Sequence, residues 1–154
     1  MTQQVATGQV ADDLPACSIE RSLQVLGERW TLLVLREVFA GRHRFAEIRA
    51  ALDIAPNLLS ARLKTLVLAG VLEARPYQEP GSRQRHSYHL TPAGWELRLV
   101  LGALQQWGDE HRPRTAGPSA LRKSKSGDAV HVAFVNADGV EVPTRDVKFV
   151  LNEP

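Results

Sequence analysis

The order of elements between residues 45 and 90 predicts an α+β fold. Two apolar-periodic segments, 45–52 and 57–69, are separated by a four-residue break that ends at Pro56. Two β-like runs follow and enclose the basic loop 81–86. Helix, tight turn, helix and hairpin in this order are typical of a winged helix-turn-helix, whose second helix enters a DNA groove. We therefore expect a winged helix-turn-helix with flanking helices and a small C-terminal β appendage.

Bulk composition is that of an ordinary globular chain. The 154 residues are 44% apolar and 23% charged, close to globular averages. No apolar run approaches the roughly 18 residues of a membrane-spanning helix, and the polar start lacks the basic-then-apolar pattern of a secretory signal. We expect a cytoplasmic protein that does not enter a membrane.

Positive charge is concentrated on the segment assigned to DNA. Residues 40–90 hold eight Lys and Arg against four acids, whereas residues 1–39 hold three against five. Neutralisation of phosphates would then contribute affinity for nucleic acid. A basic face with no partner remains the alternative on charge alone.

The helices that flank the central motif carry more apolar surface than a small winged core covers. A first helix is predicted from Ser18 to a stop at Gly27, and a second at residues 29–40. Thr91 and Pro92 open a last helix that runs to about residue 111. Together the terminal helices predict a homodimer, with packing inside one chain as the alternative.

Four regions are expected along the chain. Residues 1–14 form a flexible arm, and residues 15–112 form the DNA-binding and dimerisation domain. Residues 113–127, rich in Pro, Gly, Ser and bases, form a basic linker. Residues 128–154 form the β appendage: a hairpin signal at Asn136-Ala137-Asp138-Gly139 lies between two β-like runs, and a third run at 147–151 is a candidate strand.

The fourth helix supplies most of the candidates for DNA contact, because its leucines occupy one stripe and leave the opposite face for a groove. The full set is Asn57, Ser60, Ala61, Arg62, Lys64, Arg44, Arg83 and Arg85. Asn57, Ser60 and Ala61 suit base edges, since Asn pairs with adenine and a small Ala leaves room for a thymine methyl. Lys64, Arg62 and Arg44 suit phosphates. Arg83 and Arg85 lie in the wing and suit the minor groove.

Chemistry beyond binding has few candidates. Cys17 is the only cysteine, so an intramolecular disulfide and a cysteine zinc site are excluded, although a disulfide between chains is not. A thiol at a helix N-terminus favours the thiolate, which makes Cys17 a candidate redox sensor, with an inert residue as the alternative. The histidines lack metal-ligand spacing and no catalytic group or phosphate loop is found. We expect no enzyme activity, metal or cofactor.

Several segments together resemble one known family. They are residues 17–20, 26–37, 44–48, 58–66, 69–72, 88–94 and 107–108, in the right order. In this respect the chain resembles the HxlR-type bacterial transcriptional regulators over about two thirds of its length. The resemblance implies a homodimer, built from the first and last helices, that binds an inverted-repeat operator and represses or activates genes. It also implies that Cys17 stands where some members sense oxidants or electrophiles.

Two other functions remain open. A small-molecule effector, rather than an oxidant, could bind near the dimer helices, where Trp30, Trp95 and Trp107 would offer an aromatic lining. Intramolecular packing explains these tryptophans equally well. A protein-interaction module that keeps the winged fold without reading DNA is the third alternative.

Overall fold

The computed structural model describes residues 14–152 and contains two compact units, which meet in sequence between Glu96 and Leu97. Helices and small antiparallel sheets are both present, so the predicted α+β class is confirmed. The arm predicted for residues 1–14 lies outside the described residues apart from Leu14. The first unit contains α1 (Ser18–Leu26), α2 (Arg29–Phe39), α3 (Phe45–Leu52), α4 (Pro56–Leu68), β1 (Leu72–Tyr77), β2 (Arg85–Leu90) and α5 (Pro92–Glu96).

The core of the first unit forms around α2 and α4. Val34 and Leu35 of α2 and Leu59 and Leu66 of α4 are completely buried, as is Ile48 of α3. With Val38 and Leu63, which are at most 2% exposed, the buried residues of α2 and of α4 recur every three or four positions and therefore share one face of each helix. Each such side chain contributes about 1.5–3 kcal/mol when it is removed from water. The stripe predicted for the fourth helix is therefore the face that α4 buries.

Local hydrogen bonds and backbone conformation set the start of α3 and the turn between α3 and α4. Glu47 accepts hydrogen bonds from the backbone N–H groups of Arg44 (3.0 Å) and His43 (3.1 Å), which closes the start of α3. These N–H groups, that of Arg44 first, hold the pKa of the Glu47 carboxyl below its usual value. Asp53 adopts a left-handed conformation with φ of 49° after α3. Pro56 is the first residue of α4, where its missing N–H is not needed.

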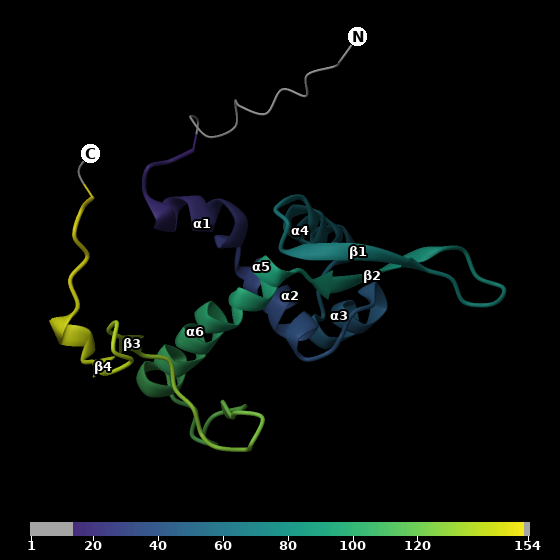
Figure 1. Ribbon diagram of the computed structural model, residues 1–154. Helices are drawn as coiled ribbons and strands as arrows, with labels where there is room; N and C mark the ends of the chain where they lie inside the picture. The colour runs from purple at the N-terminus through teal and green to yellow at the C-terminus, as the bar shows by residue number, and fades with distance from the viewer. Residues whose placement is uncertain (1–13, 153–154) are drawn as a thin grey trace, which may run out of the picture. The chain divides into compact units, whose positions relative to one another are not determined.

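Strands β1 and β2 form the wing. They pair antiparallel from Leu72 opposite Leu90 to Tyr77 opposite Arg85, and the hairpin projects beyond α3 and α4 (Figure 1). A short bridge between Arg44 and Ser87 adds the segment before α3 to the outer edge of β2. The wing is thus joined to the helix-turn-helix twice, by the chain that runs from α4 into β1 and by the bridge from β2 to the segment before α3.

The last helix was predicted to be continuous, and this prediction is wrong. The helical segment breaks at Leu97, whose ψ of −8° departs from the value near −42° of a regular helix. Before the break, α5 is attached to the winged motif, because the Thr91 hydroxyl donates to the Gly70 carbonyl and accepts from the Gly94 N–H. After the break, α6 (Arg98–His111) belongs to the second unit.

The second unit consists of α6 and the segment that follows it. The Gln106 side chain donates to the Val132 carbonyl (3.0 Å) and accepts from the Val132 N–H (2.9 Å). Gln105 donates to the carbonyl of Ala120, and Arg122 lies 3.3 Å from Asp109. The segment predicted to be a basic linker is thus attached to α6 in at least two places.

The predicted hairpin at residues 136–139 is present but short. β3 (Phe134–Val135) pairs with β4 (Glu141–Val142), and Asn136 accepts from the N–H groups of Asp138 and Val140. The third strand proposed for residues 147–151 does not form: a 3₁₀ turn, Thr144–Asp146, follows Pro143, and no strand is found after it up to residue 152. Within residues 14–152, no helix is long and apolar enough to cross a membrane.

Gly94 offers a test of how α5 is attached. A Cβ at Gly94 would lie 2.1 Å from the Val71 carbonyl oxygen, a backbone atom that cannot move aside freely. We expect Gly94→Ala to lower the free energy of unfolding by about 1–3 kcal/mol, measured by urea denaturation. Gly108→Ala is the matched control, because Gly108 is also helical and has open space around its Cβ position. It should be neutral or stabilising by up to about 1 kcal/mol, and equal losses in the two variants would contradict the close contact.

Candidate nucleic-acid interface

The outward face of α4 carries four of the predicted DNA contacts. Asn57, Ser60, Ala61 and Lys64 are exposed, opposite the buried leucine stripe. Burial of the leucines fixes the rotation of the helix about its axis, so these four side chains have to face away from the core. The helix has no acidic residue on any face.

Two predicted phosphate contacts are already engaged. Arg62 is turned toward Glu28 at the start of α2, with N–O distance 3.8 Å, and only 20% of its side chain is exposed. Arg44 forms an ion pair with Glu79 at 2.6 Å, and its guanidinium lies 4.7 Å from the centre of the Tyr77 ring. Arg44 therefore joins the start of α3 to the wing. Both arginines therefore have an acidic partner, although 47% of the Arg44 side chain remains exposed.

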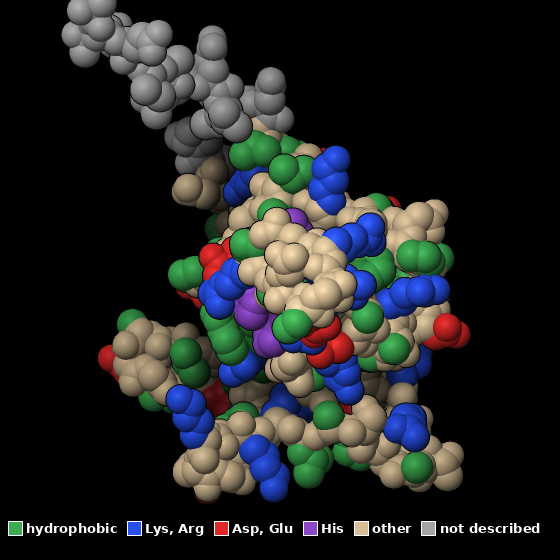
Figure 2. Space-filling model, turned by 90° about the vertical axis from the view of Figure 1, so that its right-hand side faces the viewer, with side chains coloured by type: hydrophobic (Ala, Val, Ile, Leu, Met, Phe, Trp, Pro, Cys, Tyr) green, Lys and Arg blue, Asp and Glu red, His purple; other side chains and the backbone are tan. Residues whose placement is uncertain are grey.

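The wing loop leaves its two arginines free. Gly81 adopts φ of 76°, and the loop is closed by a hydrogen bond from the Ser82 N–H to the Glu79 carbonyl. Arg83 and Arg85 are exposed, and neither has an acidic partner within the described part of the chain. Figure 2 looks onto the side to which the hairpin points, and it shows Lys and Arg side chains spread over much of that face with fewer acids among them.

The two faces of the hairpin have different surroundings. On one face the ring of His89 stacks on that of His43, with centres 4.5 Å apart, and His43 Nδ1 lies 2.9 Å from the Tyr88 carbonyl oxygen. Burial, Arg75 and His43 lower the pKa of His89, so its imidazole is neutral at pH 7 and stacks without charge repulsion. This face is closed against the segment before α3.

The opposite face of the hairpin forms one wall of a groove. Ala74, His86 and Tyr88 line it from β1 and β2, while Ser60, Lys64 and Leu68 line it from α4. Ser60 and Lys64 were predicted from the sequence as DNA contacts, whereas His86 and Tyr88 were not. The signal was present, because residues 86 and 88 alternate with 85, 87 and 89 along one strand and therefore share a face.

Comparisons with known proteins agree with this architecture. A family model of the HxlR-like helix-turn-helix matches residues 25–116, more than half of the chain. The chain belongs to the HxlR family. An uncharacterised HTH-type transcriptional regulator of Mycobacterium tuberculosis, Rv3095, is 40% identical to this HxlR-family chain over 132 residues, which are 84% of this chain and 82% of the relative.

Solved structures give the same result. PA1607, solved as a candidate transcription factor, is 32% identical with a TM-score of 0.76, and the match covers 89% of this chain and 96% of PA1607. The redox regulator HypR in its reduced form is 25% identical with a TM-score of 0.56, over 62% of this chain and 94% of HypR. This HxlR-family protein is a transcriptional regulator with a helix-turn-helix DNA-binding fold, and its family and relatives are regulators rather than enzymes, as predicted.

Cys17 of the HxlR-family chain is exposed and stands immediately before α1 as its N-cap residue. The nearby Arg21 guanidinium donates to the carbonyls of Pro15 (2.6 Å) and Ala16 (2.7 Å), so it holds the backbone ahead of the cysteine. No group of three or more His, Cys, Asp or Glu side chains within residues 14–152 is arranged to hold a metal ion.

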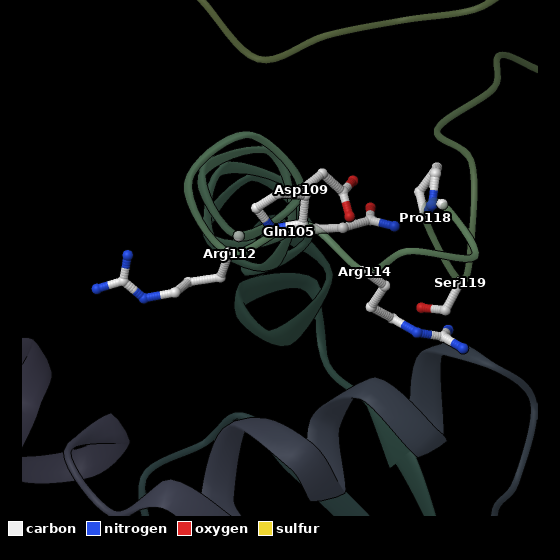
Figure 3. Close-up of a pocket in the computed structure, with 9 residues that line it drawn as sticks. Gln105, Asp109, Arg112, Arg114, Pro118 and Ser119 are labelled. Carbon is white, nitrogen blue, oxygen red and sulfur yellow. The ribbon is translucent and has the colours of Figure 1, made fainter.

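Two of the three tryptophans of the predicted aromatic effector site pack against other rings in this HxlR-family chain. Trp95 packs edge-on against Phe39 with ring centres 5.7 Å apart, and Trp107 lies 5.2 Å from the His111 ring. A hollow of about 250 Å³ lies instead beside the end of α6, between that helix and residues 113–119. In Figure 3, Arg114 extends toward Ser119 while Arg112 points away. The lining of the hollow combines prolines and glycines with charged and polar side chains and includes no tryptophan.

Proposed function

We propose that the protein binds an inverted-repeat operator as a homodimer, with α4 in the major groove and the wing beside it. The observation that carries the proposal is the outward face of α4, which is free of acids and exposes Asn57, Ser60, Ala61 and Lys64 next to a basic wing. A helix held by a buried leucine stripe presents its remaining face at a fixed angle, as groove recognition requires.

The four α4 residues divide by chemistry. Asn57, in the first turn, suits a bidentate contact to adenine, whereas Ser60 and Ala61 suit base edges and a thymine methyl. Lys64, one turn further along, suits a phosphate. Arg83 and Arg85 suit the minor groove or the phosphates beside it, because both are exposed at the end of the wing. Arg44 and Arg62 would have to exchange their partners Glu79 and Glu28 for phosphates before they could bind DNA directly. Their contribution is therefore to hold the elements they join in position.

Binding assays on full-length protein at several salt concentrations test these roles. Lys64→Ala should weaken binding to every duplex alike and reduce the slope of log affinity against log salt by about two, because each subunit of the dimer leaves one phosphate without its cation. Asn57→Ala should cost about 1–3 kcal/mol for each half-site of the preferred sequence and little on other DNA.

Lys148→Ala, which removes an exposed lysine from the second unit, is the matched control and should leave the salt slope unchanged. If Lys64→Ala and Lys148→Ala bind DNA equally well, α4 does not contact DNA.

The homodimer is supported by apolar side chains that the single chain leaves exposed. Val100, Leu104 and Trp107 lie on one face of α6, and Ile19 and Leu23 lie on one face of α1. The opposite face of α6, with Gly102, Gln106 and Asp109, is covered by the chain's own C-terminal segment. The apolar face of α6 with Val100, Leu104 and Trp107 is therefore available to a second copy.

A substitution on this face tests the dimer. Leu104→Ser should raise the dimer dissociation constant by about 100-fold or more, because a two-fold interface loses the leucine twice and each loss costs about 1.5–3 kcal/mol. Light scattering after gel filtration, over a range of protein concentrations, measures the change. Leu68→Ser is the control, since Leu68 is an exposed leucine of α4. A wild-type protein that is monomeric at every concentration would refute the homodimer.

Redox control through Cys17 is a second candidate function. It is supported by the exposure of the thiol at the start of α1 and by the similarity to the redox regulator HypR. Two Cys17 thiols in a dimer could form a disulfide between chains when an oxidant such as diamide removes two electrons and two protons. A small-molecule effector remains the alternative, and the hollow beside α6 is then a better location than the tryptophans.

Diamide separates these alternatives. If Cys17 is the sensor, diamide should change the DNA affinity of the wild-type protein and leave Cys17→Ser unaffected, and non-reducing electrophoresis should show a linked dimer in the wild-type protein alone. An equal response in both proteins would show that Cys17 is not the sensor.

A further inference from the structure

The groove between α4 and the hairpin is lined from both elements, so contacts made by α4 alone do not account for it. It has a volume of about 260 Å³ and is open to solvent. Pockets that enclose drug-sized ligands usually measure about 300–1,000 Å³ and bury most of the ligand. The groove is therefore suited to a small part of a larger partner that approaches from outside.

The pairing of β1 and β2 determines which side chains face this groove. Ala74 lies opposite Tyr88, and Pro76 lies opposite His86, so Ala74, His86 and Tyr88 share one face of the hairpin. Glu73 alternates with Ala74 and faces the other way, toward Arg75 and His89. Because of this alternation, the acid nearest in sequence is kept out of the groove.

The lining combines one cation and several hydrogen-bond donors with the apolar side chains of Val67, Leu68 and Ala74, and it contains no carboxylate. Lys64 supplies the charge, while Tyr88, His86 and Ser60 supply donors. Within residues 14–152 these four side chains form no hydrogen bond or ion pair with another residue. Burial raises the pKa of the Tyr88 phenol, which keeps the hydroxyl protonated and able to donate.

We propose that this groove is the seat of one phosphate of the DNA backbone, bound by Lys64 from α4 and by Tyr88 and His86 from β2. The proposal deepens the proposed function and rests on it, since it names the part of the duplex that lies between helix and wing. A phosphate offers only acceptors and negative charge, which matches a lining of donors and one cation. A base edge, which mixes donors and acceptors, matches it less well.

The seat would also link the two DNA-reading elements. α4 contributes Lys64 and the hairpin contributes Tyr88, so one phosphate contacts both and fixes the position of the wing relative to the helix on the duplex. Such a contact carries no sequence information of its own. It should therefore weaken specific and non-specific binding alike when it is lost.

The test uses the full-length protein and a duplex selected by that protein from random-sequence DNA. Tyr88→Phe should lower affinity about 100-fold on this duplex and on an unrelated one, because each subunit of the dimer loses one hydrogen bond to a charged group. The salt slope should not change, since the phosphate is still neutralised by Lys64. Tyr77→Phe is the matched control: Tyr77 is a half-buried tyrosine of the same hairpin on the opposite face.

A second variant fills the groove without removing a donor. Ala74→Leu adds a branched side chain between Lys64 and Tyr88 and should also weaken both duplexes, by about tenfold or more. Ala74 is exposed, so the fold should tolerate the change, which circular dichroism and thermal unfolding would verify.

Duplexes with single neutral methylphosphonates identify the phosphate itself. One position in each half-site should weaken wild-type binding more than it weakens the binding of Tyr88→Phe, whereas the effects of other positions should be the same in both proteins. Additive effects at every position, or Tyr88→Phe and Ala74→Leu proteins that bind like wild type, would overturn the phosphate seat. If only the phosphate seat is wrong, Lys64→Ala and Asn57→Ala should still weaken DNA binding. If these two variants also bind DNA like the wild-type protein, DNA binding through α4 is refuted as well.

Discussion

Burial of the leucine stripe of α4 is the constraint on which the rest of the structure depends. Leu59, Leu63 and Leu66 are at most 1% exposed and pack in a core shared with α2. A helix fixed in this way cannot rotate without placing leucine in water, at a cost of several kcal/mol. The polar face of α4, the groove beside it and the hairpin that borders the groove all take their positions from this packing.

The fold was largely predictable because its signals are local. Apolar periodicity located α1 to α4, Pro56 and Gly27 marked helix ends, and Asn136 with Gly139 marked the β3–β4 turn. The break at Leu97 was not predictable from periodicity, because the apolar pattern continues through it. It follows from tertiary contacts of α5, in which Gly94 approaches the Val71 carbonyl and Thr91 bonds to Gly70.

The candidate site was predictable in part. Outward residues of α4 follow from the helical period, so Asn57 and Lys64 could be named from the sequence. The engagement of Arg44 with Glu79, 35 residues away, and of Arg62 with Glu28 depends on tertiary pairing that no local pattern reveals. His86 and Tyr88 needed the strand register as well, since only the pairing with Ala74 and Pro76 places them beside α4.

The hydrogen bonds between Gln106 and Val132 determine where the segment after α6 can tolerate inserted residues. One side-chain amide satisfies both backbone groups of Val132, in the manner of a neighbouring β-strand, so the C-terminal segment is held in a single register along α6. Between this point and the ion pair at Arg122, the chain makes a tight turn closed by a hydrogen bond from Ser124 to the Asp128 carbonyl, with Gly127 at φ of 95°. Residues inserted at the tip of that turn would extend into solvent and leave both attachments in place. Insertions and deletions during evolution should therefore collect at that tip, whereas the spacing between Gln105 and Asp109 stays constant.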